Sequence, residues 1–360
     1  MYSPDKPYNK LPLLPPKLTL TPKVYNKAIQ ANKALAELKG MTGLIPNPVI
    51  ILDSLVLREA RDSSAIENIV TTQDELYKAY SVGNTDLNAA VKEVLNYKQA
   101  MWLGYELIKK KKLITTRELM KIQECLMGNN AGIRNQPGTA LKQVRTGKVI
   151  YTPPFGKDII QDKLKNLEEY INGTNEDMDP LIRMGIMHYQ FESIHPFYDG
   201  NGRTGRILNV LYLIHEGLLE LPILYLSSFI IKQKKQYYKG LNNVRQNRNW
   251  EEWIVYMLES VAYSATDTIK TIRGIKLLLE KTIEKVKLKR PKIYSKELVE
   301  VLFHQPYARI SALEDQLGIT RFTASKYLKD LEKIGVLKGE KVGRDMLYIN
   351  IDLFNLLKAG

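Results

Sequence analysis

The spacing of apolar residues along the chain predicts a mainly helical protein. Between Leu181 and Ile194 an apolar residue recurs at every third or fourth position. Residues three and four apart lie on one face of an α-helix, so this segment should bury one side against a core. Similar patterns predict helices that start near Pro22 and Pro48, and others over residues 86–109, 115–127, 158–172, 206–215 and 250–271.

Proline and glycine interrupt the helical pattern in two places. The N-terminal segment through Pro16 is rich in proline, which prevents a regular helix and predicts an extended arm over the surface. Residues 147–155 read Gly-Lys-Val-Ile-Tyr-Thr-Pro-Pro-Phe. Strand-forming residues between a glycine and a proline pair predict a short strand or a hairpin arm.

The tail beyond residue 292 has its own pattern of two helices, a turn, a third helix and two short strands. Gly318 supplies the turn, and Thr320 can cap the helix that follows it. Residues 335–337 and 346–349 flank Gly343-Arg344 in the way that two strands flank a wing. The tail therefore resembles a winged-helix domain.

Composition narrows the class of protein. The chain has 360 residues and a formal net charge of +14, which favours polyanionic partners, although many lysines also simply solvate helix faces. No run of about eighteen apolar residues predicts a membrane span, and the N-terminus lacks the pattern of a signal peptide. Cys125 is the only cysteine, which excludes an intrachain disulfide and predicts a cytoplasmic protein.

One short run, from His195 to Arg206, combines the residue types of a nucleotide site. Its three glycines allow tight turns and close approach to a ligand, and the helix that follows offers N–H groups to phosphate oxygens. Arg203 and Arg206 can neutralise phosphates. Asp199 suits Mg²⁺, which takes one or two carboxylates beside phosphate oxygens. His195 can act as a general base near neutral pH.

The same run matches every defined position of His-Pro-Phe-x-Asp-Gly-Asn-Gly-Arg-x-Gly-Arg, the signature of Fic proteins. The chain resembles Fic protein adenylyltransferases of the SoFic type. This resemblance implies a mainly α fold, a Fic-fold helical bundle with a small β-hairpin flap, followed by a small winged-helix domain. It implies an N-terminal arm and helical region with an inhibitory helix over 1–110, a Fic catalytic core over 111–280 and the winged-helix domain over 290–360.

The resemblance implies transfer of AMP from ATP, with Mg²⁺, to a tyrosine, threonine or serine hydroxyl of a target protein or of the chain itself. His195 would deprotonate the hydroxyl, Asp199 would hold Mg²⁺, and Phe197 would seat the loop in the core. Gly202 favours AMP transfer, because phosphorylating relatives have lysine there. The residues implied to contact ATP are Glu67, Gly200, Asn201, Gly202, Arg203, Thr204, Gly205, Arg206 and Tyr237.

Two further features have an implied role and an open alternative. Val149, Ile150 and Tyr151 resemble the Fic flap, which clamps the modifiable side chain of the target by strand pairing. An ordinary surface hairpin is the alternative. Tyr237 resembles the tyrosine that stacks near the adenine, and packing in the core is the alternative for it and for Tyr238.

An upstream segment matches the inhibitory pattern of the family, [Ser/Thr]-x-x-x-Glu-[Gly/Asn], at Ser63, Glu67 and Asn68. Four residues make about one helical turn, so Ser63 and Glu67 share a face. A carboxylate that reaches Arg206 would compete with the γ-phosphate of ATP. The sequence therefore predicts an autoinhibited enzyme.

The winged-helix segment is basic. Residues 285–360 contain fifteen Lys and Arg and nine Asp and Glu, a net charge of +6. Binding to DNA is one prediction; contacts to protein or dimerisation is the alternative. The residues predicted to contact DNA are Arg321, Thr323, Ser325, Lys326 and Arg344.

Two other functions stay open at this point. One is a winged-helix transcriptional regulator that uses the Fic fold as a nucleotide sensor, although a pure sensor needs no catalytic base. The other is transfer of a nucleotide other than AMP. The resemblance also leaves a homodimer open, in which the partner helps to position the inhibitory helix.

Overall fold

The computed structural model describes residues 2–42, 48–82, 87–143, 146–173, 177–342 and 345–359. Within these ranges the chain is mainly helical with two small sheets, which confirms the predicted fold class. The helices before residue 250 are α1 (Pro22–Thr42), α2 (Pro48–Ile66), α3 (Gln73–Val82), α4 (Ala89–Lys111), α5 (Thr116–Met127), α6 (Lys157–Asn172), α7 (Pro180–Ile194), α8 (Asn201–His215), α9 (Ser227–Lys232) and α10 (Lys234–Asn247). In the part of the chain that is described, no helix is long and apolar enough to span a membrane.

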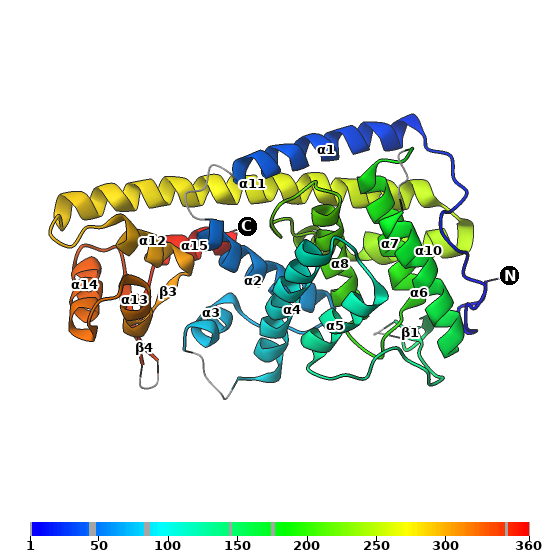
Figure 1. Ribbon diagram of the computed structural model, residues 1–360, viewed down its shortest axis with the longest axis horizontal. Coiled ribbons are helices and arrows are strands. Elements are labelled where there is room, and N and C mark those ends of the chain that lie inside the picture. The colour runs from blue at the N-terminus through cyan, green and yellow to red at the C-terminus, as the bar shows by residue number, and fades with distance from the viewer. Residues whose placement is uncertain are drawn as a thin grey trace.

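A single helix, α11 (Trp250–Lys289), runs the length of the molecule, and α1 lies along it (Figure 1). Its 40 residues give it a length of about 60 Å. The predicted helix over 250–271 starts correctly but is too short, because Ile272, Ile275 and Val286 stay buried beyond residue 271. At its start the Trp253 indole donates a hydrogen bond of 2.7 Å to the carbonyl of Gly185 in α7.

Helices α7 and α8, which flank the glycine-rich run, are almost entirely buried. Every residue of α7 after Pro180 is buried, so this helix is surrounded by other elements. The prediction of a helix over 206–215 was wrong at its start, because α8 begins at Asn201, inside the glycine-rich run. Gly200 has φ of 78° and ends the turn, so the residues after it can enter the helix at once.

The N-terminal arm crosses α6, α7 and the hairpin without regular secondary structure, as predicted. Leu11 and Leu14 are nevertheless buried. Lys163 of α6 donates a hydrogen bond of 2.7 Å to the carbonyl of Leu11, and Gln190 of α7 donates one of 2.8 Å to that of Pro12. The arm is therefore fastened through its backbone carbonyls.

The predicted hairpin is present as β1 (Leu141–Lys142) paired antiparallel with β2 (Val149–Tyr151). The Tyr151 side chain is fully buried, and its hydroxyl donates a hydrogen bond of 2.6 Å to the carbonyl of Ser193 in α7. Tyr151 thus anchors the hairpin beside the end of α7.

The C-terminal elements gather at the far end of α11 from the N-terminus (Figure 1). They are α12 (Lys296–His304), β3 (Tyr307–Ala308), α13 (Ile310–Leu317), α14 (Arg321–Lys333), β4 (Lys338–Val342), β5 (Asp345–Ile349) and α15 (Ile351–Ala359). The three strands form one sheet in the order β3-β5-β4.

The turn between α13 and α14 confirms the prediction made from Gly318 and Thr320. Gly318 has φ of 62°, and the Thr320 hydroxyl caps α14 by accepting a bond of 3.3 Å from the N–H of Thr323. The first predicted strand, 335–337, was wrong, since Gly335 turns the chain with φ of 68° and β4 begins only at Lys338. Gly343 and Arg344, predicted for the tip of the wing, lie outside the described residues.

A cluster of aromatic rings joins the C-terminal elements to α3. The ring of Tyr307 in β3 stacks on Tyr77 with centroids 6.0 Å apart and meets Phe354 of α15 edge-on at 5.9 Å. The Tyr307 hydroxyl donates to Asp74, and Ser81 donates a bond of 3.1 Å to the Tyr307 carbonyl. Helix α12 also packs on α2, so the C-terminal elements lie against the helix that ends directly before Glu67.

Tyr307→Ala should destabilise the protein, because it removes a buried ring from this cluster. Loss of a buried aromatic side chain costs about 3–5 kcal/mol. Chemical denaturation should show a lower free energy of unfolding for this variant. Phe322→Ala is the control, because Phe322 is 81% exposed in the same region. Equal stability of the two variants would contradict the described packing.

Candidate active site

The loop from His195 to Gly200 joins two helices that meet near one point. His195 ends α7 with φ of 49° and ψ of 60°, an uncommon backbone region for a residue other than glycine. Gly200 precedes α8, whose N-terminus has no side-chain cap. The first N–H groups of a helix lack partners within the helix, so this end can bind an anion.

Two residues hold the loop in shape from within. Phe197 is 1% exposed, which confirms that it anchors the loop in the core. The Asn201 amide bonds the backbone N–H and carbonyl of Phe197, both at 2.8 Å. The amide nitrogen has a second hydrogen, so the contact of Asn201 to an α-phosphate stays a prediction.

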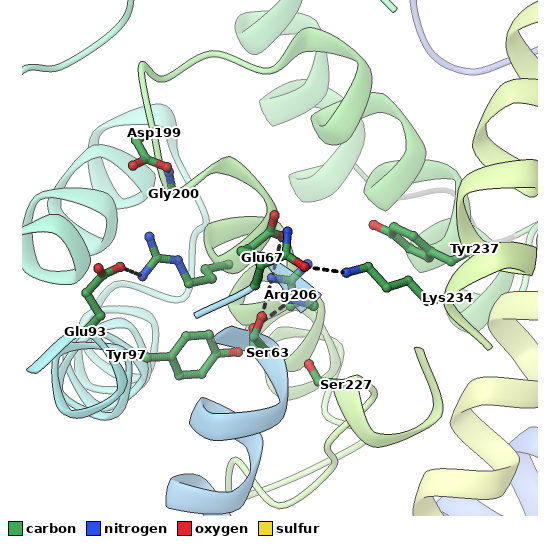
Figure 2. Close-up of polar contacts among 12 residues, drawn as sticks. Ser63, Glu67, Glu93, Tyr97, Asp199, Gly200, Arg206, Ser227, Lys234 and Tyr237 are labelled. Carbon is green, nitrogen blue, oxygen red and sulfur yellow. Dashed lines mark hydrogen bonds and ion pairs between the residues drawn. The ribbon is translucent and has the colours of Figure 1, made fainter. Parts of the chain in front are cut away.

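Arg206 on α8 receives all of its described hydrogen-bond partners from Ser63 near the end of α2 and from Glu67, the first residue after that helix (Figure 2). Its Nε donates to the Ser63 hydroxyl at 2.7 Å, and its Nη2 donates to the Ser63 carbonyl at 2.9 Å and to Glu67 Oε1 at 2.9 Å. Arg206 is 2% exposed, so these contacts form in a largely dry environment. Ser63 and Glu67, four residues apart in the predicted pattern, thus both contact the guanidinium of Arg206.

The carboxylate of Glu67 lies directly over the backbone of α8. Burial alone would raise the pKa of Glu67, but the charge and hydrogen bond of Arg206 hold it below its usual value, with His195 and Arg203 acting in the same direction. A Cβ atom on Gly202 would lie only 2.3 Å from Glu67 Oε1. The glycine therefore leaves the space that this carboxylate occupies above the helix N-terminus.

The second arginine predicted to bind phosphate also has a carboxylate partner. Arg203 is 2% exposed, and its Nη1 donates a hydrogen bond of 2.7 Å to Glu93 Oε2 from α4 (Figure 2). Sequence reasoning missed Glu93, because a glutamate on an ordinary amphipathic helix gives no sign of a partner far along the chain. Both predicted phosphate-binding arginines are thus neutralised by the protein itself.

A buried carboxylate, also missed, anchors α2 below Ser63. Glu59 accepts hydrogen bonds from the Tyr97 hydroxyl at 3.1 Å and from the Ser227 hydroxyl and N–H at 2.5 and 3.2 Å. Burial raises the pKa of Glu59 to about 7, against the lowering effect of Ser227. Glu59 ties α2, which ends directly before Glu67, to α4 and α9.

The imidazole of His195 is suited to accept a proton. Burial and the Arg134 guanidinium lower the pKa of His195 to about 4, while Glu67 acts in the opposite direction. At neutral pH the ring is therefore uncharged, which is the form that a general base requires. Its Nδ1 is buried and has no hydrogen-bond partner among the described residues.

Asp199 lies exposed at the mouth of the loop. Its Oδ1 accepts a hydrogen bond of 2.6 Å from the N–H of Gly200, and the described salt bridges do not include it. No group of three or more His, Cys, Asp and Glu side chains able to hold a metal occurs in the described part of the chain. A Mg²⁺ ion at Asp199 would therefore need phosphate oxygens as well, which agrees with the coordination that Mg²⁺ prefers.

A cavity of about 530 Å³ lies beside Glu67, between the β1–β2 hairpin and α10. Its walls contain apolar, aromatic and basic side chains. The lining residues are Ile66, Glu67, Asn68, Ala140, Leu141, Lys142, Gln143, Ile150, Tyr151, Glu192, Lys234, Lys235, Tyr238, Leu241, Asn242 and Arg245.

The cavity redirects the prediction made for Tyr237. This side chain is 2% exposed, and its hydroxyl lies 2.8 Å from Nε2 of the buried His188, so its ring belongs to the core. Tyr238 is 41% exposed and lines the cavity. Tyr238, the next residue of α10, is thus the tyrosine whose ring is open to a ligand in the cavity.

The other predicted site residues divide between the cavity and the core. Thr204 is fully buried, and a Cβ on Gly205 would lie 3.0 Å from Phe191, so these two serve the packing of α8 on α7. Asn68 has φ of 64° and accepts a bond of 3.4 Å from Lys234 at the cavity wall.

Three family models match the chain in consecutive order. The Fic/DOC family N-terminal model matches residues 25–106, the Fic/DOC family model matches 113–213, and the model of the C-terminal domain of SoFic-like protein adenylyltransferases matches 278–353. The chain belongs to the Fic/DOC family.

Curated relatives with a similar sequence are protein adenylyltransferases. Protein adenylyltransferase fic-1 of Caenorhabditis elegans is 31% identical over 90 residues, which cover 25% of this chain and 16% of that protein. A probable protein adenylyltransferase of Aquifex aeolicus is 24% identical over 216 residues, covering 52% of this chain and 60% of that protein. The chain thus spans less than two thirds of the length of these relatives.

Solved structures share the fold. A Fic family protein from Desulfovibrio desulfuricans G20 superposes with a TM-score of 0.58 and 19% identity, covering 93% of this chain and 98% of that one. Fic-1 from C. elegans gives a TM-score of 0.54 and 18% identity, covering 70% and 74% of the two chains.

Glu192→Gln should stabilise the protein above neutral pH. Burial raises the pKa of Glu192 from 4.5 to about 7, and its Oε1 has no hydrogen-bond partner among the described residues. The folded state therefore holds the proton more tightly than the unfolded state, and stability falls as pH rises through this window. The melting temperature of the variant should exceed that of the wild type at pH 8, and the gain should disappear at pH 4.5. An equal shift at both pH values would contradict this reading.

Proposed function

We propose that this protein is an autoinhibited protein adenylyltransferase. It transfers AMP from ATP to a tyrosine, threonine or serine hydroxyl of a target protein or of itself. The observation that supports this most is the contact of Glu67 with Arg206 at 2.9 Å, beside a loop that carries a neutral histidine and a free helix N-terminus. A binding protein without chemistry would need neither the base nor a carboxylate in the place of a phosphate.

The proposed inhibition is a competition between two anions for one arginine. Glu67 satisfies the buried guanidinium of Arg206 and lies above the backbone of Gly202, near the unpaired N–H groups of α8. The carboxylate occupies the place of a γ-phosphate at Arg206, and its negative charge repels that phosphate. ATP therefore reaches a reactive pose only after Glu67 has moved away.

In the proposed reaction His195 takes the proton of the target hydroxyl. The hydroxyl oxygen forms a bond to the α-phosphorus, the bond from that phosphorus to the bridging oxygen breaks, and pyrophosphate leaves. Arg203 and Arg206 hold the β- and γ-phosphates, which requires Glu93 and Glu67 to release them. Asp199 would hold Mg²⁺, which would supply positive charge to stabilise the negative charge of the phosphate oxygens. The protein contributes mainly position and charge.

The residues that line the cavity support assignments for the adenine contact and for the flap that holds the target protein. Tyr238 replaces Tyr237 as the residue proposed to contact the adenine. Leu141 and Ile150 line the cavity from the hairpin, which supports a flap that holds a target strand. Tyr151 fixes this flap to α7 through its hydroxyl.

We retain the division of the chain into units over 1–110, 111–280 and 290–360 as part of the proposal. The first two family matches, over 25–106 and 113–213, fall within the first two units. The third match begins at residue 278 and so includes the last turns of α11. The end of α11, Lys289, thus falls between the proposed second and third units but inside the third family match.

Glu67→Gly should activate the enzyme. A hydrogen bond to a charged group contributes about 1.5–3 kcal/mol, so transfer of label from ATP at low concentration should rise about ten- to a hundredfold. The measurement is incorporation of ³²P from α-labelled ATP into the protein. His195→Ala in the same background should lower the rate at least about a hundredfold, because it removes the base.

Unchanged labelling by Glu67→Gly, while ATP still binds, would contradict autoinhibition. Glu37→Gly is a matched control, because Glu37 pairs with Arg273 on the surface at 2.8 Å, and it should leave labelling unchanged. The same assay with labelled GTP, CTP and UTP tests transfer of another nucleotide. Binding of ATP without any transfer in the Glu67→Gly variant would favour the nucleotide sensor.

We also propose that the C-terminal elements bind duplex DNA through α14. Arg321 and Lys326 are exposed on this helix, with Thr323 and Ser325 half-buried beside them. The full-length protein should shift duplex DNA, and Arg321→Ala with Lys326→Ala should weaken binding and reduce the salt dependence by about two phosphate contacts.

The matched control for this experiment is Lys109→Ala with Lys110→Ala, which removes the same charge from α4. Equal loss of binding in the two double variants would mean that only the total charge matters. Absence of binding at low salt would instead favour a surface for protein contacts, including a homodimer.

A further inference from the structure

The three carbonyl groups at the start of the catalytic loop accept hydrogen bonds from one residue that the motif does not contain. Arg134 donates from Nε to the carbonyl of His195 at 2.7 Å and from Nη2 to that of Ile194 at 3.2 Å. Its backbone N–H donates to the carbonyl of Pro196 at 2.9 Å. The same Nη2 also donates to the carbonyl of Pro154, beyond the hairpin.

The surroundings of Arg134 differ from those of an ordinary buried arginine. The side chain is 1% exposed, and the described ion pairs include no carboxylate partner for it. A buried guanidinium without a counter-ion is unfavourable unless its hydrogen bonds are satisfied. Here backbone carbonyls satisfy them, and these carbonyls belong to the loop that carries the base.

His195 needs such support because of its backbone conformation. Its φ of 49° and ψ of 60° lie in the left-handed region, which favours glycine. The segment beside it is held in register by a β-bridge between Ile133 and Phe197. Asn135 and Tyr198 are also joined, from the N–H of Asn135 to the hydroxyl of Tyr198 at 3.1 Å. Arg134 thus lies in the middle of a segment, residues 133–135, that runs alongside the loop and contacts it at each residue.

We propose that Arg134 is a positioning residue for His195: the guanidinium and the N–H of Arg134 clamp the carbonyls of residues 194 to 196 and hold the imidazole in place. This proposal depends on the role of His195 as the base in the proposed function. The clamp fixes the backbone on both sides of the histidine, so the ring cannot leave its place when the target binds.

The same guanidinium also acts on the ring through its charge. Among the groups that face His195, Arg134 and Arg245 of α10 lower its pKa, while Glu67, directly after α2, and the carbonyl of Glu192 in α7 raise it. Burial acts in the same direction as the two arginines. Arg134 therefore supports the proton-free form of the base as well as its position.

Two variants separate position from charge. Arg134→Lys keeps the charge but cannot reach three carbonyls, whereas Arg134→Met removes both. Each is made in the full-length chain in the Glu67→Gly background, so that transfer can be measured. Arg183→Lys and Arg183→Met are matched controls, because Arg183 is also buried and donates from Nη2 to the carbonyls of Tyr170, Ile171 and Gly173.

We expect kcat to fall about tenfold or more in both Arg134 variants, with little change in KM for ATP, since a displaced base affects the chemical step. The Arg183 variants should lose stability but keep kcat. The acidic limb of the pH–rate profile should move upward by about one unit in Arg134→Met and stay in place in Arg134→Lys.

A second readout does not require activity. The chain has four histidines, so ¹⁵N NMR can follow each imidazole, with His195→Ala identifying the signal. The His195 signal should titrate about one unit higher in Arg134→Met than in its parent. If no AMP transfer occurs in any variant, the proposed function fails while this titration still tests the role of Arg134.

An unmoved His195 titration in Arg134→Met, or a kcat in the Arg134 variants equal to that of the Arg183 variants, would overturn the proposal. If Arg134→Met does not fold, Arg134→Lys decides the question. A fall in kcat with unchanged KM for ATP supports the clamp, and unchanged kcat refutes it.

Discussion

The structure depends above all on the need to pair the buried charge of Arg206. A guanidinium that is 2% exposed cannot rely on water, and leaving a buried charge without a partner costs several kcal/mol. In this conformation Ser63 of α2 and Glu67, directly after that helix, supply the partners. In the proposed reaction a phosphate takes their place. Activation is then an exchange of one anion for another, so modest forces can shift the balance.

Helix α2, which ends directly before Glu67, is fastened at several points, so it is not a free lid. Glu59 joins α2 to α4 and α9 through Tyr97 and Ser227. The C-terminal elements pack on α2 and α3, where Tyr307 stacks on Tyr77. Local release of the Glu67 side chain therefore requires less rearrangement than movement of the whole helix. The contacts also place the C-terminal elements within reach of any change in α2.

The catalytic loop shows a second kind of constraint, which concerns its backbone. Phe197 fixes one side of the loop in the core, and Asn201 closes it through the backbone of Phe197. Arg134 fastens the other side, at His195. The result is a base held in an uncommon conformation, uncharged at neutral pH, next to a helix end that favours anions. The position and the protonation state of His195 thus arise from one compact arrangement, beside the helix end proposed to bind phosphate.

The sequence alone predicted most of the helices, the hairpin, the loop motif and the common face of Ser63 and Glu67, because spacing along the chain encodes which residues share a face. It could not choose between Tyr237 and Tyr238, since two adjacent aromatic residues have the same chemistry and only burial separates them. It missed Arg134, Glu93 and Glu59 for a related reason. Their partners are carbonyls and side chains distant in the chain, which leave no local pattern. Only the tertiary structure brings these groups together, because close packing decides which polar groups leave water and which partner each must then find.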